Sequence, residues 1–478
     1  MAAPSRSLSQ SKVLAGLRLL STPPAWLAAA VDPNRVQAEL ASAVPEFASG
    51  ALTLWSCEPE RLRLKDDSGC WTCAYEATVS TPAGELRSVS LAGTLHPPGR
   101  PEPAHASGRF SAAGWQCSLP ALGLFLYTRP ADAELPAVGL LTDAEKARVM
   151  LERSIRESAP AYADLRISSC TPRVMRHKPG SRCTVAYTLR YPPEAARRGW
   201  PELVVAKAYH EDKGHNAYAA MRALWDSPLS AGDVAAIAEP LAYLESDRVL
   251  VQGPVAEEQT LKELLQAALS ERTETTAEAL TWALRQSGAG LAALHRCGVD
   301  YGEPVTLDDE LAEVREIAER LAAPIPAVAE AAIPLLTLVE KLAAGCPPDP
   351  LAPSHRSFRP AQVLLAAGRI AFIDFDGFCQ AEPALDVALF RTTIKAIGLG
   401  TPLEDEAARR TRLAQLDTLC DIFTDAYTDH ASVSSERVAL WETLDLLTNL
   451  LNSWAKIKLG RLEGTLLALE ARVERLLD

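Results

Sequence analysis

Three features that would place this protein in a special class are missing from its 478 residues. No apolar segment provides the roughly 20 uninterrupted residues that a helix needs to cross a bilayer, because charges interrupt the longest ones. No block of Lys and Arg offers the concentrated basic surface that neutralises nucleic-acid phosphates, and the formal net charge is −13. The sequence therefore predicts neither a membrane protein nor a nucleic-acid-binding protein.

A disulfide framework is also missing. The ten cysteines are scattered from Cys57 to Cys420, which is the pattern of a protein in a reducing cytoplasm. Cys70 and Cys73 have the spacing of a redox motif or of half a zinc site, but they lie in an apparent strand and no second such pair exists, so we interpret them as structural. The first 31 residues are basic and lack acids, a faint likeness to a transit peptide, but an ordinary Ala-rich amphipathic start is the simpler interpretation.

What the sequence does contain is enough apolar material, 48% of its residues, for a large core in two or three domains. Strand-like runs cover about 52–126 and 167–255, separated by a helix over 142–157 that begins with the capping-box pattern Thr142 to Glu145. Apolar residues recur at three and four spacings in the second half, which predicts helices. These expected helices are Leu261–Leu269, Thr276–Leu294, Asp308–Leu321, Ala327–Ala343, Glu406–Tyr427 and Ser435–Leu477.

The two strand-rich regions resemble each other. Segments starting at Ser56 and at Ser169 share Ser-Cys, Pro, Lys, Cys and Ala-Tyr with a single-residue slip, and a further strand follows each. This predicts a duplicated antiparallel unit, with chance similarity of hairpins as the alternative. The alignment places Lys207 of the second copy opposite Gly93 of the first. Because a lysine within an apolar strand is costly unless it reaches an anion, we predict a functional second copy and a scaffolding first copy.

Two acids follow the last strand of a short hairpin. Apolar runs over 363–365 and 370–373 flank a turn at Gly368, and Asp374 and Asp376 come directly after the second run. Carboxylates at the end of a buried strand lie at the rim of the core, where they can hold a cation or a phosphate-bound metal. The hairpin therefore predicts such a site.

The order of these parts resembles one known group of proteins. The chain from about Leu165 to Asp478 is similar to the aminoglycoside phosphotransferase, choline kinase and maltokinase group of the protein-kinase-like superfamily. The parts that carry the resemblance are the Gly-bearing turn Lys178–Arg182, the strand lysine Lys207, a helix over 214–225, the strand Val249–Gln252, a helix ending at His295 and the loop from His355 to the hairpin.

The resemblance implies an α+β, two-lobed protein-kinase-like fold. It implies an antiparallel-sheet N-lobe over 161–254 and a helical C-lobe over 255–478. An extra strand-rich N-terminal domain over 1–160, resembling a degenerate copy of the N-lobe, would precede them.

Two motifs of that group carry the implied chemistry. The family pattern HGDxxxxN corresponds to the segment from His355 to Gln362, and IDxxxxxxxxPxxDLA corresponds to the segment from Ile373 to Ala388. By this resemblance Asp374 and Gln362 would bind magnesium, and Asp386 would brace the catalytic loop. The ATP phosphates would contact Lys207, and the implied nucleotide site further includes Gly180, Gln252 and Val255.

The chain departs from the family at the catalytic base. Ser357 stands at the position of the base aspartate, and a serine hydroxyl cannot serve as that base at neutral pH, so Asp376 or a water would have to replace it. Gln362 replaces an Asn and offers the same carbonyl ligand. The helix after Lys207 has no Glu at the depth of an ion pair with the lysine. We interpret His355 as a hydrogen-bonding residue of the loop.

Two functions remain open at this point. One is ATP- and magnesium-dependent phosphoryl transfer to a hydroxyl of a small molecule. The other is a pseudokinase, a nucleotide-binding or wholly non-catalytic module that presents a surface to a protein partner. The acids of the helices over Glu406–Leu477 are interpreted as a solvated face, with contact to a cationic acceptor as the alternative; they include Asp417, Asp421, Asp425 and Asp429.

Overall fold

The fold was analysed in a computed structural model. The structure describes residues 16–17, 19–65, 68–99, 110, 114–128, 135–178, 180–195, 197–231, 234–400 and 405–477. By its contacts the chain divides into two compact units, one of 1–131, 308–345 and 443–478, the other of 132–307 and 346–442. Within the described ranges, no helix combines the length and the apolar character that a membrane span needs.

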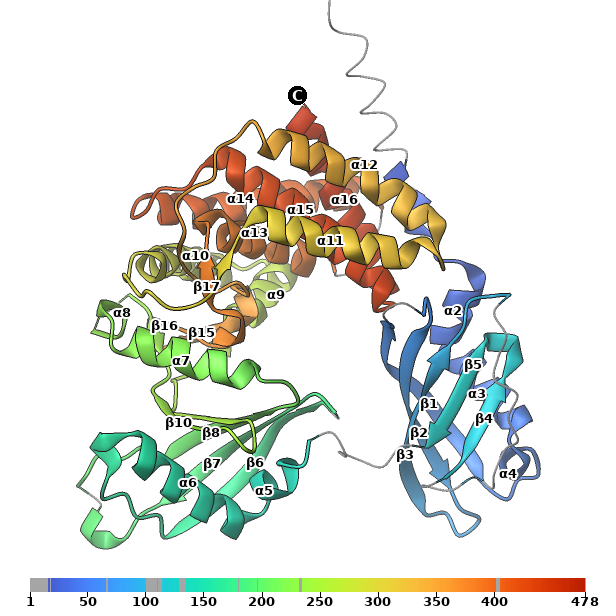
Figure 1. Ribbon diagram of the computed structural model, residues 1–478, viewed down its shortest axis with the longest axis horizontal. Helices are drawn as coiled ribbons and strands as arrows, with labels where there is room; N and C mark the ends of the chain where they lie inside the picture. Colours follow the sequence, from blue (N-terminus) through green and yellow to red (C-terminus); the bar gives the residue numbers. More distant parts are fainter. Residues whose placement is uncertain are drawn as a thin grey trace, which may run out of the picture. The chain divides into compact units, whose positions relative to one another are not determined.

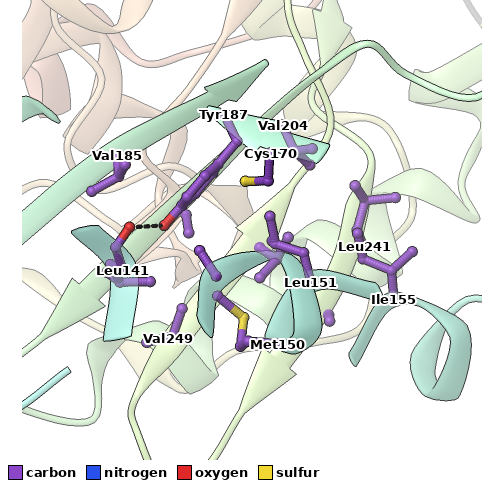
Figure 2. Packing of buried hydrophobic residues seen from close by; sticks show 14 of the residues in the cluster. Leu141, Met150, Leu151, Ile155, Cys170, Val185, Tyr187, Val204, Leu241 and Val249 are labelled. Carbon is purple, nitrogen blue, oxygen red and sulfur yellow. Dashed lines mark hydrogen bonds between the residues drawn. The ribbon is translucent and has the colours of Figure 1, made fainter. Parts of the chain in front are cut away.

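The unit of 132–307 and 346–442 begins with a five-stranded antiparallel sheet in the order β10-β11-β8-β7-β6. Its strands are β6 (Ser169–Lys178), β7 (Arg182–Arg190), β8 (Leu203–Tyr209), β10 (Pro240–Leu244) and β11 (Val249–Gln252). Helices α5 (Val138–Thr142) and α6 (Ala144–Ser158) pack on this sheet (Figure 1). Leu151 and Ile155 of α6 share one core with Val185 and Leu241 of the strands, as Figure 2 shows.

The start of α6 differs from the prediction. Asp143, not Thr142, is the N-cap, and its Oδ1 accepts hydrogen bonds from the backbone N–H groups of Glu145 at 3.1 Å and Lys146 at 3.0 Å. Thr142 still belongs to the preceding helix α5, and its hydroxyl donates to the Val138 carbonyl. The capping-box prediction is therefore wrong by one residue, because the chain leaves α5 only after Thr142.

The rest of this unit is largely helical. Its helices are α7 (Lys213–Trp225), α8 (Pro228–Ala231), α9 (Leu261–Glu271), α10 (Glu274–His295), α13 (Pro383–Leu399) and α14 (Glu406–Thr428). Its short strands are β9 (Ala236–Ile237), β12 (Gln259–Thr260), β13 (Pro304–Val305), β14 (Ala352–Ser354), β15 (Val363–Ala366), β16 (Arg369–Phe372) and β17 (Cys379–Ala381). Within this unit, the helices expected over 261–269, 276–294 and 406–427 and the expected hairpin β15–β16 are confirmed, within a few residues at their ends.

The unit of 1–131, 308–345 and 443–478 contains a second five-stranded antiparallel sheet, in the order β1-β2-β3-β5-β4. Its strands are β1 (Thr53–Leu64), β2 (Trp71–Ser80), β3 (Leu86–Leu95), β4 (Gln116–Leu119) and β5 (Leu124–Thr128). Its helices are α2 (Ala25–Val31), α3 (Pro33–Ala43), α4 (Pro45–Ala48), α11 (Leu307–Ala322), α12 (Pro326–Ala343) and α16 (Leu462–Leu477). Helix α15 (Ser435–Ala455) crosses the boundary between the units.

The segment expected as one helix over Ser435–Leu477 is two helices. Ile457 has a left-handed φ of 49°, and a 3-10 turn over Leu459–Arg461 separates α15 from α16. A β-branched residue rarely adopts this conformation, so the break is a defined turn rather than a kink in one helix. The apolar period continues on both sides, which is why the sequence alone does not reveal it.

The two sheets repeat the same structure. Each has the strand order first-second-third-fifth-fourth in its own numbering, and Tyr75 and Tyr187 face Pro59 and Pro172 at the same place in the first strand pair. Both tyrosine hydroxyls donate to a carbonyl in the last turn of a preceding helix, Ala30 at 2.8 Å and Leu141 at 2.9 Å. The predicted duplication is thus confirmed in topology, and it extends to the helices before each sheet.

This equivalence predicts a matched pair of stability effects. Both hydroxyls are buried, and the carbonyls that they bind lie where helical partners run out. We expect Tyr75→Phe and Tyr187→Phe each to lower the free energy of unfolding by about 0.5–1.5 kcal/mol. Urea denaturation measures this, with the exposed Tyr127→Phe as control. A loss at only one of the two tyrosines would contradict their equivalence.

The strand register corrects the predicted match between Lys207 and Gly93. Tyr75 pairs with Leu91 across β2–β3, and Tyr187 pairs with Val204 across β7–β8. Counting along each third strand from these pairs places Lys207 at the position of Thr94. A one-residue shift exchanges the two faces of a strand, so the difference matters. Thr94 is uncharged, so the first sheet still lacks a lysine at this position, in agreement with a scaffolding role.

Candidate nucleotide and metal site

The carboxylates that end the hairpin are turned by a strained residue. Asp374 follows β16 with a left-handed φ of 76°, an uncommon conformation for a residue other than glycine. The Ser357 hydroxyl lies 3.3 Å from the Asp374 carbonyl oxygen, within hydrogen-bond range. A 3-10 turn over Phe375–Gly377 then presents Asp376 beside Asp374. This turn therefore places the carboxylates of Asp374 and Asp376 next to each other, directly after the buried strand β16.

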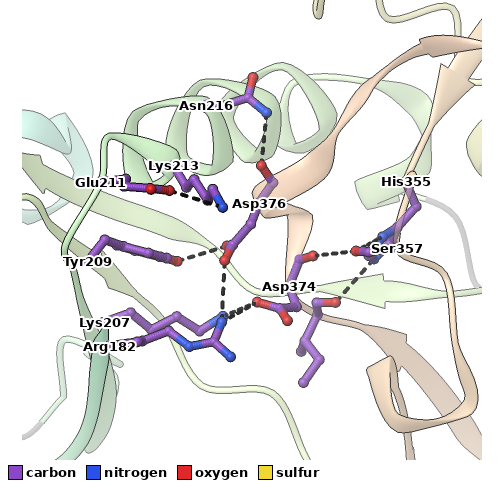
Figure 3. A network of polar contacts seen from close by, with 11 residues as sticks. Arg182, Lys207, Tyr209, Glu211, Lys213, Asn216, His355, Ser357, Asp374 and Asp376 are labelled. Atoms are coloured by element: carbon purple, nitrogen blue, oxygen red, sulfur yellow. Dashed lines mark hydrogen bonds and ion pairs between the residues drawn. The ribbon is translucent and has the colours of Figure 1, made fainter. Parts of the chain in front are cut away.

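Two cations from the sheet converge on these acids (Figure 3). Lys207 of β8 is only 9% exposed, and its Nζ lies 3.0 Å from Asp374 Oδ1. Arg182, the first residue of β7, places Nη1 3.4 Å from Asp374 Oδ1 and 3.4 Å from Asp376 Oδ2. The site thus balances two positive against two negative charges.

The two carboxyl groups differ in their electrostatics. Burial alone would raise the pKa of Asp374, but the charges of Lys207 and Arg182 outweigh it and hold the pKa of this group well below its usual range. Burial, and then the charge of Asp374, raise the pKa of Asp376. The Tyr209 hydroxyl donates to Asp376 Oδ1 at 2.8 Å, which partly offsets that increase. Asp374 is therefore the firmer anion of the pair.

Helix α7 reaches the site through an amide instead of a glutamate. Asn216 Nδ2 donates to the carbonyl oxygens of Asp376 at 3.2 Å and Phe378 at 3.1 Å, and the Tyr301 hydroxyl donates to Asn216 Oδ1 at 3.1 Å. These bonds tie the helix to the backbone of the acidic segment. The carboxylate that orients Lys207 is Asp374 rather than a residue of α7.

The loop that carries Ser357 is held by a buried carboxylate. Asp386 of α13 is fully buried, and its Oδ2 accepts a hydrogen bond from the His355 backbone N–H at 2.6 Å. The same oxygen lies 3.3 Å from His295 Nε2, and His295 Nδ1 lies 2.9 Å from the Tyr427 hydroxyl. Asp386 can therefore hold the backbone of this loop in place, as the resemblance implies.

Ser357 itself contacts a histidine. Its Oγ lies 3.0 Å from His355 Nδ1, and His355 Nε2 lies 3.1 Å from the Ile373 carbonyl oxygen. The imidazole is fully buried, and stacks against Phe375 with the ring centroids 4.7 Å apart. The ring is therefore fixed on three sides.

Gln362 offers an acceptor oxygen next to Asp374. The Gln362 carbonyl accepts a hydrogen bond from the N–H of Ile373 at 3.1 Å, which places Gln362 across the hairpin from the residue that directly precedes Asp374. Its side-chain Oε1 is buried without a hydrogen-bond partner among the residues that the structure describes. Magnesium is usually held by one or two protein oxygens together with phosphate oxygens and water, so this unpartnered oxygen and the Asp374 carboxylate fit it. No cluster of three His, Cys, Asp or Glu side chains competes for a metal within the described ranges.

Three further residues were predicted to contact the nucleotide: Gly180, Gln252 and Val255. Gly180 lies in the turn before Arg182 with a left-handed φ of 63°, while its neighbour Pro179 is outside the described residues. Gln252 ends β11, buried and paired with Val205 of β8, and Val255 follows it half-buried. Their contact with a nucleotide stays a prediction.

Three residues of the site escaped the sequence analysis: Arg182, Tyr209 and Asn216. Arg182 directly follows the Gly-bearing turn, and Tyr209 lies two residues beyond Lys207 and hence on the same face of β8. The register gives a stronger signal, because the positions of Arg182 and Tyr209 are held by Cys70 and His96 in the first sheet. The two copies therefore differ at each of these charged or polar positions.

The five-stranded sheet, the helices that follow it and the acids between them define this part of the chain as a protein-kinase-like fold. Residues 204–419 match the model of the phosphotransferase enzyme family. No curated protein matches the chain.

Several solved structures are similar at low identity, among them the following three. A glucosamine kinase has 14% identity and a TM-score of 0.47, with 96% of this chain and 99% of that chain covered. A choline kinase from Cryptosporidium parvum Iowa II has 11% identity and a TM-score of 0.46, with 69% and 95% covered. A choline/ethanolamine kinase family protein from Mesorhizobium loti has 15% identity and a TM-score of 0.42, with 64% and 88% covered.

Proposed function

We propose that this protein transfers the γ-phosphoryl group of ATP to a hydroxyl group of a small molecule, with magnesium as cofactor. The observation that carries this proposal is the convergence of Lys207 and Arg182 on Asp374 and Asp376, beside the unpartnered oxygen of Gln362. A buried lysine and a partly buried arginine that meet two carboxylates suit the binding of magnesium and phosphate groups, which is the chemistry of the family whose model residues 204–419 match.

The geometry supports an exchange of partners on binding. Asp374 and Gln362 would hold the magnesium ion, which supplies charge neutralisation on the phosphates. Lys207 and Arg182, released from the carboxylates, would then contact phosphate oxygens. Because phosphoryl transfer requires little covalent help, positioned cations of this kind supply most of the catalysis. Arg182 adds a second cation to the lysine that the resemblance implies.

A non-catalytic nucleotide-binding module is the second candidate. Ser357 at the base position favours it, and so does the ion pair of Lys207 with Asp374, which neutralises the site without any ligand. Protein partners of such a module, and the identity of the acceptor in the enzyme, are open. We also propose a cytoplasmic location, which is supported by the ten cysteines, none of them in a disulfide among the described residues.

Nucleotide binding can be tested by thermal denaturation. We expect ATP with magnesium to raise the melting temperature by several degrees, because a ligand at 100 times its Kd stabilises the native state by about 2.7 kcal/mol. Chelation of the magnesium with EDTA is expected to remove most of this shift. Magnesium alone and AMP with magnesium serve as controls. No shift with ATP and magnesium would reject both candidate functions.

A further inference from the structure

The hydrogen bonds of His355 define where its proton lies. Nε2 lies 3.1 Å from a carbonyl oxygen, which only accepts hydrogen bonds, so Nε2 carries the proton. In a neutral imidazole the other nitrogen then has none. Nδ1 is therefore a bare lone pair, 3.0 Å from Ser357 Oγ, and the one hydroxyl proton can be donated either to Nδ1 or to the Asp374 carbonyl oxygen at 3.3 Å.

The surroundings keep the ring neutral at rest. Burial lowers the pKa of His355, although the charges of Asp386 and Asp374 act in the opposite direction. These carboxylates, with His295 behind Asp386, are the titratable groups that face the ring. A proton arriving at Nδ1 would thus form an imidazolium beside two anions, which stabilise it.

The other candidate base is already engaged. Asp376 accepts a hydrogen bond from the Tyr209 hydroxyl on Oδ1, and its Oδ2 lies 3.4 Å from Arg182 Nη1. Both of its oxygens therefore have partners in the resting site. Ser357, by contrast, stands at the family's base position and is only half-buried.

We infer that His355, acting through the hydroxyl of Ser357, is the proton acceptor of the phosphoryl transfer. This inference rests on the proposed function. The acceptor oxygen forms a bond to the γ-phosphorus while the bond from that phosphorus to the β–γ bridging oxygen breaks, and its electron pair leaves with ADP. The proton of the acceptor passes to Ser357 Oγ, and the proton of Ser357 passes to His355 Nδ1. The pair replaces the aspartate that accepts the proton directly in the family.

A double-mutant cycle tests this relay, with hydrolysis of ATP in the presence of magnesium as the assay, so that water is the acceptor. Asn at position 355 keeps a hydrogen-bonding group near the position of Nδ1 but cannot take up a proton. We expect Ser357→Ala and His355→Asn each to lower kcat by about 10²-fold, the low end for a general base, with little change in KM. The combination of both substitutions is expected to be no worse than either alone.

A second experiment, in the Ser357→Asp background, distinguishes a proton relay through His355 from a purely structural role of this residue. Ser357→Asp restores a carboxylate that accepts the proton directly, so adding His355→Asn in that background should cost less than about 3-fold in kcat. An equal loss in the native and the Ser357→Asp backgrounds would show that His355 only supports the loop, and would overturn the inference. His430→Asn, in the exposed turn that follows α14, is the matched control and should leave kcat unchanged.

Two further readouts keep the test decisive. If His355→Asn fails to fold, Ser357→Thr, which keeps a hydroxyl, must retain activity within a few-fold while Ser357→Ala loses it. Native protein that gives the thermal shift with ATP and magnesium but hydrolyses no ATP overturns the relay and leaves nucleotide binding intact. Native protein without the shift rejects the proposed function instead.

Discussion

Asp374→Ala is expected to abolish the magnesium-dependent stabilisation by ATP and to lower the rate of ATP hydrolysis by at least about 10³-fold. The carboxylate is a proposed magnesium ligand together with Gln362, and its Oδ1 lies 3.0 Å from Lys207 Nζ. Its removal takes away a proposed magnesium ligand and leaves two cations without their main counterion. Losing one electrostatic group at a reacting phosphate typically costs about 10²–10³ in rate, and here two functions are lost together.

Thermal shift and steady-state hydrolysis measure this prediction side by side. Asp374→Asn keeps the size of the side chain and is expected to lose activity while retaining the fold. Asp164→Ala is a matched control, since this carboxylate is exposed and pairs with an exposed arginine, Arg198. A full magnesium-dependent shift in Asp374→Ala would mean that the nucleotide site lies elsewhere.

Glu442→Ala is expected to lower the free energy of unfolding by about 3–5 kcal/mol. Glu442 is fully buried and lies 2.8 Å from Arg391 Nε and 3.2 Å from Lys395 Nζ. Both cations are themselves buried, and burial of an unpaired charge is costly. Removing the shared carboxylate leaves them with the less buried acids of α14.

Denaturant unfolding measures this loss. Glu406→Ala is the control, because Glu406 pairs with Arg410 on the exposed face of α14 and should contribute about 0.3–0.5 kcal/mol. A loss below about 1 kcal/mol for Glu442→Ala would show that water or rearrangement compensates both cations.

Two acids of α14 belong to the same network of ion pairs. Asp417 lies 3.0 Å from Lys395 Nζ, and Asp421 lies 3.2 Å from Arg391 Nη1. Asp421 is 64% exposed, as a solvated face requires, whereas Asp417 is only 23% exposed. Both acids already have cationic partners within the protein. A cationic acceptor would therefore have to displace Lys395 or Arg391.

Much of the functional argument could be made from the sequence. The alternation of short apolar runs with Gly turns predicted the hairpin β15–β16, and the lysine within an apolar strand predicted contact with an anion, which the resemblance gave as the ATP phosphates. In the structure Lys207 contacts Asp374, a residue 167 positions away in the chain that the sequence did not reveal as its partner. The family resemblance, predicted over about 165–478 and matched by the family model over 204–419, was readable because its motif keeps Asp374, Pro383 and Asp386 at fixed spacing.

Other features could not be read from local patterns. Arg182 and Asn216 belong to the site only because β7 and α7 pack against the acidic segment. The N-cap at Asp143 and the break at Ile457 depend on where the preceding helix stops, which periodicity does not reveal. The match of Lys207 with Thr94 needs the strand register, since a single slip in sequence exchanges the faces of a strand.

By itself the sequence determined which chemical groups are present. They are a lysine within a strand, a pair of carboxylates after a hairpin, a glutamine where the family has an asparagine, and a serine where the family has the base aspartate. Only the tertiary structure decided which of these groups meet. Packing places Nδ1 of His355 within hydrogen-bond distance of the Ser357 hydroxyl. It also brings Lys207 and Arg182 next to Asp374 as its counterions. The physical reason is that side-chain chemistry is local to a residue, whereas the partner, the pKa and the proton of that residue depend on distant segments that packing brings within about 3 Å.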